Sequence, residues 1–219
     1  MPGRSRRPDS AAARHGRVSP AGRGPGNPPG AHFLTDRALI AQLARASGVG
    51  PGDLVFDLGA GYGALTAPAA RSGARVIAVE LDPALAVRLR RRFADQAQVG
   101  IVEADLRTVP LPKREFHVVA SPPFALTTLL CRRLLGDPSV RLAGAELVLE
   151  WGAARWLAGP PRNAETARWA ARYHIRIVRR VPAASFSPPP RSDAAYLTIR
   201  PRSKLDGRRH EPRRHITAR

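Results

Sequence analysis

A short apolar strand that runs directly into a glycine-rich turn constrains the fold more than any other feature of this 219-residue chain. The strand, 55–58, contains Asp57 and is followed by Gly59, Gly61, Gly63 and an alanine-rich segment. This order is typical of a nucleotide-binding loop, in which glycines let the backbone approach the ligand closely. The spacing is G-x-G-x-G and differs from the G-x-G-x-x-G of dinucleotide dehydrogenases. A tight turn that joins any strand to any helix is the alternative interpretation.

Asp57 indicates which kind of ligand such a loop suits. A carboxylate beside the loop disfavours a pyrophosphate, because two negative charges repel each other. The same carboxylate tolerates a sulfonium ligand that carries an amino-acid ammonium group. S-adenosylmethionine has both groups, and it is the cofactor that we predict.

Two further acidic residues end the next two predicted strands. The run 75–79 ends in Glu80, about 20 residues after Gly59, and the run 99–102 leads to Asp105. Successive strands of a doubly wound sheet line their carboxyl ends along one crevice. We therefore expect Glu80 to accept the two ribose hydroxyls of the cofactor and Asp105 to accept its adenine N6 amine. Either acid alone would more commonly be a solvated or capping residue.

A second candidate site follows the apolar run 116–120. There, Ser121-Pro122-Pro123-Phe124 combines a hydroxyl, two prolines and an aromatic ring at the end of a predicted strand. The Ser121 hydroxyl and the Pro122 carbonyl can accept the two hydrogens of an exocyclic amine, while Phe124 stacks on the base. The alternative is a proline-rich turn in which Ser121 caps the following helix.

The remaining periodicity predicts a doubly wound α/β fold with helices on both faces of a mostly parallel sheet. Helices are expected at 36–47, 64–72, 83–94 and 125–135, with strands at 54–58, 75–80, 98–103, 115–120 and 146–149. A tryptophan-containing helical region extends to about Tyr173, and two strands at 174–181 and 194–199 complete the expected sheet.

These motifs resemble those of the ribosomal RNA adenine N6-methyltransferases, and among them the Erm-type enzymes that modify 23S ribosomal RNA. The resemblance covers residues 30–200. It includes Gly30-Ala31-His32-Phe33-Leu34, similar to the family's G-Q-N-F-L cofactor lid, and Val79-Glu80-Leu81-Asp82. The most family-specific segment is 186–195, Phe-Ser-Pro-Pro-Pro-Arg-Ser-Asp-Ala-Ala, which is similar to F-x-P-x-P-[KR]-V-x-S-A.

The resemblance implies a Rossmann-like class I S-adenosylmethionine-dependent methyltransferase with a seven-stranded, mostly parallel sheet. The implied activity is N6-methylation of an adenine at the macrolide site of 23S rRNA, which confers resistance to macrolides, lincosamides and streptogramin B. The implied cofactor-binding residues are His32, Leu34, Asp57, Gly59, Gly61, Gly63, Glu80, Leu81, Asp105, Leu106 and Ser121. The implied catalytic residues are Ser121, Pro122 and Phe124, and those for the base or RNA are Phe124, Phe186, Arg132, Arg133 and Arg191.

Three positions depart from the family pattern. Ser121 stands where these enzymes usually carry asparagine, and Ala31 and His32 replace the glutamine and asparagine of the lid. S-P-P-[FY] is also the tetrapeptide of enzymes that methylate cytosine N4 in DNA. Two alternative functions therefore stay open: a DNA amino-methyltransferase acting on cytosine N4 or adenine N6, and a non-catalytic RNA-binding or ribosome-assembly factor with this fold.

The charge is strongly basic, with a formal net charge of +19. Residues 1–30 carry six arginines and one acid, and residues 200–219 carry eight lysines or arginines and two acids. We predict a disordered basic arm over 1–30, a methyltransferase catalytic domain over 31–200 and a basic tail over 201–219. The arms suit phosphate neutralisation on RNA. A solubilising tail, or arginine bias in the coding DNA, is the alternative.

Other classes of site find no support in the sequence. Cys131 is the only cysteine, and the histidines of the folded part show no H-x-x-x-H pairing, so we predict no metal. The sequence has no apolar run of about 18 residues and no secretory segment, so we expect a cytoplasmic protein. We also expect a monomer. The helical C-terminal domain usual in the family is expected to be missing, as in shortened Erm-type enzymes.

Overall fold

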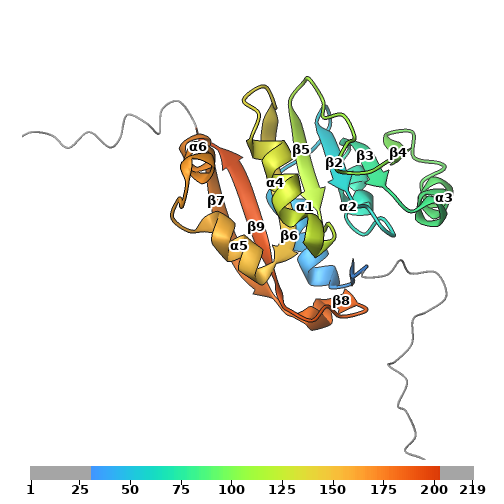
Figure 1. Cartoon of the computed structure of the whole chain (residues 1–219). Helices are drawn as coiled ribbons and strands as arrows, with labels where there is room; N and C mark the ends of the chain where they lie inside the picture. Colours follow the sequence, from blue (N-terminus) through green and yellow to red (C-terminus); the bar gives the residue numbers. More distant parts are fainter. Residues whose placement is uncertain (1–30, 203–219) are drawn as a thin grey trace, which may run out of the picture.

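The computed structural model describes residues 31–202, which form one α/β layer structure (Figure 1). Its elements in chain order are β1 (Phe33–Leu34), α1 (Arg37–Ser47), β2 (Leu54–Leu58), α2 (Thr66–Arg71), β3 (Arg75–Glu80), α3 (Pro83–Arg92), β4 (Val99–Glu103), β5 (Phe116–Ala120), η1 (Phe124–Leu126), α4 (Thr127–Leu135), β6 (Leu142–Glu150), α5 (Trp151–Ala158), α6 (Ala164–Arg172), β7 (Tyr173–Val181), η2 (Ala183–Ser185), β8 (Phe186–Ser187) and β9 (Ala194–Pro201).

Seven strands form the central sheet in the order β4-β3-β2-β5-β6-β9-β7. The first five strands of that order are parallel, whereas β9 runs antiparallel to both β6 and β7. The strand order reverses between β2 and β5, and ligands of open α/β sheets bind outside the carboxyl ends of the strands at such a point. The topology confirms the predicted seven-stranded, mostly parallel sheet.

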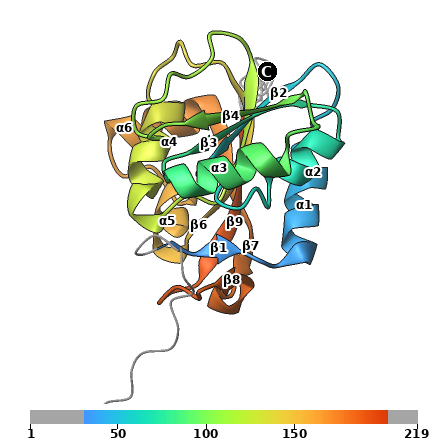
Figure 2. The same ribbon diagram turned by 90° about the vertical axis from the view of Figure 1, so that its right-hand side faces the viewer.

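Helices cover both faces of the sheet, with α1, α2 and α3 on one side and α4, α5 and α6 on the other (Figure 2). Strand β2 is buried along its whole length because it has helices above and below it. Val55 packs with α1 and α2, while Phe56 and Leu58 pack with α4. A strand buried on both faces needs a continuous apolar run, and the sequence of β2 supplies one except at Asp57.

Helix boundaries follow local capping chemistry. The Asp36 side chain accepts the Leu39 N–H at 2.9 Å and so begins α1 one residue later than predicted. Asp82 likewise accepts the Ala84 and Leu85 N–H groups, with Pro83 as the first residue of α3. Each oxygen satisfies amides that have no partner inside the helix.

The structure adds a two-stranded ladder that the sequence did not predict. Strand β1 pairs antiparallel with β8, which brings Phe33 opposite Ser187 and Leu34 opposite Phe186. Thr35 extends the contact, because its N–H donates to the Ser185 carbonyl at 2.8 Å. Two-residue strands have no readable periodicity, which explains the omission. The ladder joins the amino-terminal lid to the late proline-rich segment.

A buried carboxylate holds the antiparallel side of the sheet together. Glu146 of β6 is 1% exposed and accepts hydrogen bonds from the Tyr196 hydroxyl and the Arg200 guanidinium, both from β9. Arg200 also donates to the Ala46 carbonyl at 2.9 Å and so ties α1 to the sheet. The carboxylate is tolerated in the core because it is paired and hydrogen-bonded.

Replacement of Arg200 by alanine is expected to lower the free energy of unfolding by about 2 to 4 kcal/mol, because Glu146 would keep a buried charge without its cation. Chemical denaturation monitored by circular dichroism measures the change. Arg141→Ala is the matched control, since Arg141 pairs with Glu115 at 3.4 Å on the open surface and should matter little. Equal losses in the two variants would contradict this account of the cluster.

Within residues 31–202, no helix is long and apolar enough to cross a membrane. The same part of the chain contains no group of three or more histidine, cysteine or acidic side chains with the arrangement of a metal site. Cys131 is buried in the core at the centre of α4, and burial raises the pKa of its thiol to about 12.

Candidate active site

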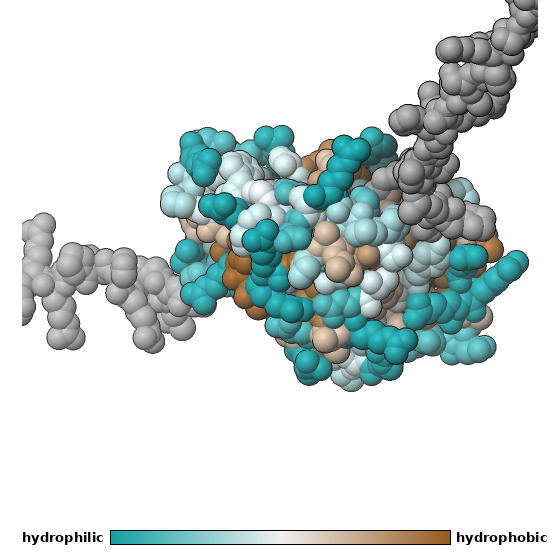
Figure 3. Space-filling model, turned by 90° about the horizontal axis from the view of Figure 1, so that it is seen from below, coloured by the Kyte–Doolittle hydropathy of each residue, from teal (hydrophilic) through white to brown (hydrophobic). Residues whose placement is uncertain are grey.

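One cavity of about 420 Å³ opens at the carboxyl ends of β2, β3, β4 and β5, where the sheet order reverses. Figure 3 views this end of the molecule, where hydrophilic residues surround apolar surface. Three separate sequence motifs meet in the cavity: the glycine loop, the ends of β3 and β4, and the Ser121–Phe124 segment. The lining residues are Ala31, His32, Phe33, Gly59, Gly61, Val79, Glu80, Leu81, Asp82, Pro83, Leu85, Ala104, Asp105, Leu106, Ser121, Pro122, Pro123, Phe124 and Leu126.

Glu80 organises the glycine loop from the end of β3. One carboxylate oxygen accepts the Gly61 N–H at 2.8 Å, and the other accepts the Asp82 N–H at 2.9 Å. Gly61 has φ 54°, and a side chain there would meet the Phe33 ring at 2.8 Å. The carboxylate therefore fixes the loop through its amides and keeps further lone pairs toward the cavity, where they suit the hydroxyls of a ribose.

Gly63, one of the predicted cofactor-binding residues, is not among the residues that line the main cavity or the smaller cavity beside it. It has φ 76°, and an added Cβ would lie 2.8 Å from Phe93 and 2.9 Å from Leu89 of the α3 region. The third glycine of the loop thus makes room for side chains packed behind the loop. Gly59 lies on the other side, facing Pro122 and Leu106, and lines the cavity.

Asp57 lies deeper, against an adjoining cavity of about 140 Å³ that shares His32, Gly61 and Ser121 with the first. The side chain is 1% exposed, and the Thr66 hydroxyl donates to it at 2.6 Å. Burial raises the pKa of the Asp57 carboxyl to about 7, although the bond from Thr66 opposes the rise. A cationic group in this cavity would favour the carboxylate form.

The end of β4 combines one acid with an apolar wall. Leu106 is buried, whereas Leu81 is 59% exposed although it lines the cavity. Two leucines and a carboxylate, Asp105, fit a flat base with an amine on its edge. Asp105 already accepts the Arg107 backbone N–H at 2.8 Å and its Nε–H at 2.6 Å, bonds that hold the pKa of the carboxyl below its ordinary value. Arg107 is a neighbour that the sequence analysis missed.

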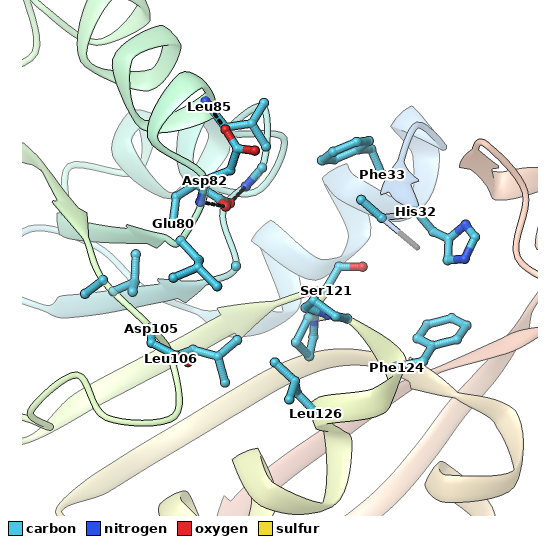
Figure 4. A pocket seen from close by; sticks show the side chains of 18 of the residues that line it. His32, Phe33, Glu80, Asp82, Leu85, Asp105, Leu106, Ser121, Phe124 and Leu126 are labelled. Atoms are coloured by element: carbon cyan, nitrogen blue, oxygen red, sulfur yellow. Dashed lines mark hydrogen bonds between the residues drawn. The ribbon is translucent and has the colours of Figure 1, made fainter. Parts of the chain in front are cut away.

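Ser121 and Phe124 lie at the other end of the cavity from Glu80 and Asp105 (Figure 4). Among the described residues, the Ser121 hydroxyl oxygen is buried and has no hydrogen-bond partner. A buried polar atom without a partner costs free energy, so such an atom in a cavity marks a place for a ligand group. Pro122 is buried beside it and cannot donate a backbone hydrogen bond. The slot therefore offers acceptors to an amine.

Phe186, predicted to contact the base or RNA, packs directly against Phe124. The two ring centroids are 5.9 Å apart at 84°, and Phe186 is 3% exposed. This edge-to-face contact places Phe186 behind Phe124 as its support. The burial of Phe186 also follows from the β1–β8 ladder, which sequence periodicity did not reveal.

The lid residues divide between the cavity and the core. His32 and Phe33 line the main cavity, and Phe33 lies against Tyr62 with ring centroids 4.6 Å apart. Leu34 is 6% exposed, packs in the core beside α1, and reaches only the smaller cavity. Phe33 is the lid residue that the predicted site omitted, although it stands in the quoted motif.

The arginines predicted to hold RNA lie in three different settings. Arg133 is partly buried and donates to the Leu106 and Val109 carbonyls, so it fixes the loop after β4. Arg132 of α4 pairs with Glu165 of α6 at 3.0 Å while staying exposed. Arg191 is exposed in the segment between β8 and β9. The contact of Arg133 with RNA therefore stays a prediction, whereas its bonds to the loop after β4 are observed.

The described architecture agrees with what comparison with known proteins finds. A model of the ribosomal RNA adenine dimethylase family matches residues 29–211, which is most of the chain. The chain belongs to this family.

The relatives of known name carry two kinds of name. An "rRNA adenine N-6-methyltransferase" of Bacillus licheniformis is 33% identical over 171 residues, which are 78% of this chain and 60% of that protein. "Ribosomal RNA small subunit methyltransferase A" of Thermosynechococcus vestitus is 36% identical over 186 residues, 80% of this chain and 69% of that protein. The chain thus spans only part of the length of its relatives, about 60% for the Bacillus protein.

A solved structure of a 23S rRNA methyltransferase is similar to this chain. The 23S rRNA methyltransferase ErmE superposes with a TM-score of 0.72 at 28% identity, over 78% of this chain and 70% of that chain. The match covers most of this chain and confirms the Rossmann-like methyltransferase fold. Together with the family match, it confirms the Erm-type resemblance that the motifs indicated.

Proposed function

We propose that this chain is an S-adenosylmethionine-dependent methyltransferase that modifies the N6 amine of an adenine in ribosomal RNA. One observation carries the proposal: a single cavity is lined by the Glu80 carboxylate, which binds the glycine loop, and by the unpartnered Ser121 hydroxyl near Phe124. A methyl donor and a flipped base need such adjoining places in one cavity.

Bound S-adenosylmethionine would supply the methyl group directly: its S–CH3 bond would break as the N6–CH3 bond forms, S-adenosylhomocysteine would be the leaving group, and the surplus N6 proton would pass to water. Glu80, Leu81, Asp105 and Leu106 would hold the nucleoside part, and Asp57 would favour the ammonium of the amino-acid part. The Ser121 hydroxyl and the Pro122 carbonyl would accept the two amine hydrogens. These bonds localise the nitrogen lone pair and aim it at the methyl donor, which is charge placement more than base catalysis.

For the target, we propose an adenine of the macrolide site in 23S rRNA, so that methylation confers resistance to macrolides, lincosamides and streptogramin B. Support comes from ErmE and from the "Mycinamicin-resistance protein MyrB" of Micromonospora griseorubida, which is 36% identical over 176 residues, 80% of this chain and 55% of that protein. A small-subunit adenine is the second candidate, favoured by the Thermosynechococcus relative.

The proposed contacts to the RNA backbone combine exposed arginines with the two basic ends of the chain. Arg191 and Arg132 supply exposed guanidinium groups in the described part. The arm 1–30 and all of the tail 201–219 beyond residue 202 lie outside the described residues, so their proposed role rests on their charge alone. We propose that residues 31–200 act as the catalytic domain, while the ends add affinity that weakens with salt.

Cofactor affinity is expected to fall about eightfold between about pH 7.5 and about pH 6, because Asp57 has a pKa of about 7 and must be ionised to pair with an ammonium. The carboxyl pKa is raised in the folded protein, so acid favours the neutral form and weakens the pair. Calorimetric titration of S-adenosylmethionine measures the change. Asp57→Asn should bind weakly at every pH in this range, and a pH-independent wild type would contradict a role for Asp57.

The experiment that tests the function is transfer of tritiated methyl groups from S-adenosylmethionine to unmodified 23S rRNA, with small-subunit rRNA and duplex DNA in parallel. Primer extension then locates the modified base. We expect transfer to 23S rRNA and a stop at an adenine of the macrolide site. Transfer to small-subunit rRNA alone would favour the second candidate, and transfer to DNA alone would overturn both.

A further inference from the structure

We propose that His32 forms the second wall of the base slot and stacks on the flipped base opposite Phe124. The inference rests on the proposed function, since it assigns a residue to the same slot. The rings of His32 and Phe124 line one cavity, with centroids 6.2 Å apart and planes tilted by 39° (Figure 4). The resemblance implies that this lid position contacts the cofactor, whereas our proposal assigns His32 to the base.

The separation of the two rings fits an inserted base. A base stacked on both sides needs about 7 Å between the flanking rings, because each contact distance is about 3.5 Å. The observed distance of 6.2 Å between the two ring centroids is slightly shorter than this spacing. To stack on a base together with Phe124, the His32 ring would have to move slightly outward and rotate to remove the 39° tilt. His32 and Phe124 are only partly buried, so such a movement leaves the core intact.

Both walls are fixed by the same late segment of the chain. The His32 Nδ1 atom lies 2.9 Å from the Pro188 carbonyl oxygen, which can only accept, so Nδ1 carries the hydrogen. Phe124 is supported from behind by Phe186, two residues before Pro188. The adjacent β1–β8 ladder joins Phe33 to Ser187. The segment 186–188 therefore holds the two walls in a common frame.

A histidine suits this position better than an asparagine does. The imidazole ring offers a flat face to a base, and aromatic faces stack on any base at about 1 to 3 kcal/mol per base, or a factor of about 5 to 100 in affinity. An asparagine, the residue usual in the family's lid, has no such ring. We therefore infer that stacking on the lid residue His32 contributes part of the affinity for the base.

The test uses a short single-stranded RNA that carries one 2-aminopurine, whose fluorescence is quenched when the base stacks on an aromatic ring. The RNA is titrated into full-length protein saturated with S-adenosylhomocysteine, for the wild type, His32→Ala, His32→Asn, His32→Phe and Phe124→Ala. S-adenosylhomocysteine affinity is measured for each variant by calorimetry. We expect His32→Ala and His32→Asn to lose about 5- to 100-fold in base affinity while cofactor affinity stays within about twofold. His32→Phe should retain the quench.

Two results would overturn the proposal, and they are distinguishable. A quench that depends on Phe124 but is unchanged in His32→Ala, with cofactor affinity reduced, would make His32 a cofactor contact and leave the proposed function standing. A quench that is the same in wild type and Phe124→Ala would remove the base slot itself, and the proposed function would fail with it. Retained cofactor affinity in Phe124→Ala shows that the loss is not unfolding.

Discussion

Replacement of Phe124 by alanine is expected to lower kcat/KM for methyl transfer to RNA at least about a hundredfold while leaving cofactor affinity unchanged. Stacking of an aromatic ring on a base contributes about 1 to 3 kcal/mol, and a misplaced reacting atom adds a further loss in rate. Phe124 lies at the slot end of the cavity, away from Glu80, so the cofactor end should not change. Steady-state kinetics with tritiated S-adenosylmethionine measure the loss.

Phe124→Tyr is the matched control, because it keeps the ring and its support by Phe186. We expect this variant to keep kcat/KM within about tenfold of the wild-type value. If Phe124→Ala methylated RNA as fast as the wild type did, the ring would have no part in holding the base. A parallel loss of cofactor binding would instead indicate collapse of the cavity.

Glu80→Ala is expected to weaken cofactor binding at least about a hundredfold. The substitution removes the acceptor of two loop amides, Gly61 N–H and Asp82 N–H, as well as the oxygens proposed for the ribose. A hydrogen bond to a charged group contributes about 1.5 to 3 kcal/mol, so the loss of two ribose bonds alone accounts for this factor. Calorimetric titration of S-adenosylmethionine or S-adenosylhomocysteine provides the measurement.

Glu103→Ala serves as the matched control, because Glu103 lies beside Glu80 at the end of the neighbouring strand. Glu103 does not line the cavity and pairs with Arg90 on the surface at 3.1 Å. Cofactor affinity should therefore be unchanged in Glu103→Ala. Equal losses in both variants would mean that general negative charge, and not the Glu80 geometry, attracts the cofactor.

The sequence predicted those parts of the fold and site that depend on strand order. Each part of the site follows an apolar run, namely the glycine loop, Glu80, Asp105 and Ser121. Parallel strands bring the carboxyl ends of these runs together. That rule alone predicts that one cavity is lined by Gly59, Gly61, Glu80, Asp105 and Ser121. Their proposed roles toward cofactor and base stay predictions.

The parts that sequence could not predict depend on contacts between distant segments. Arg133 looked like a free cation, but its guanidinium bonds the carbonyls of Leu106 and Val109, more than 20 residues away. Phe186 looked like a base-stacking ring, but the β1–β8 ladder buries it behind Phe124. Side-chain direction at such positions follows from tertiary packing, which has no local period to reveal it.

The central claim is that the slot methylates the N6 amine of adenine. The most direct measurement is to incubate the full chain with unmodified ribosomal RNA and tritiated S-adenosylmethionine, digest the RNA to nucleosides and identify the labelled one by chromatography and mass. The account predicts label in N6-methyladenosine or N6,N6-dimethyladenosine, absent with Phe124→Ala. Label in N4-methylcytidine, or no label in any nucleoside despite measured cofactor binding, would contradict it.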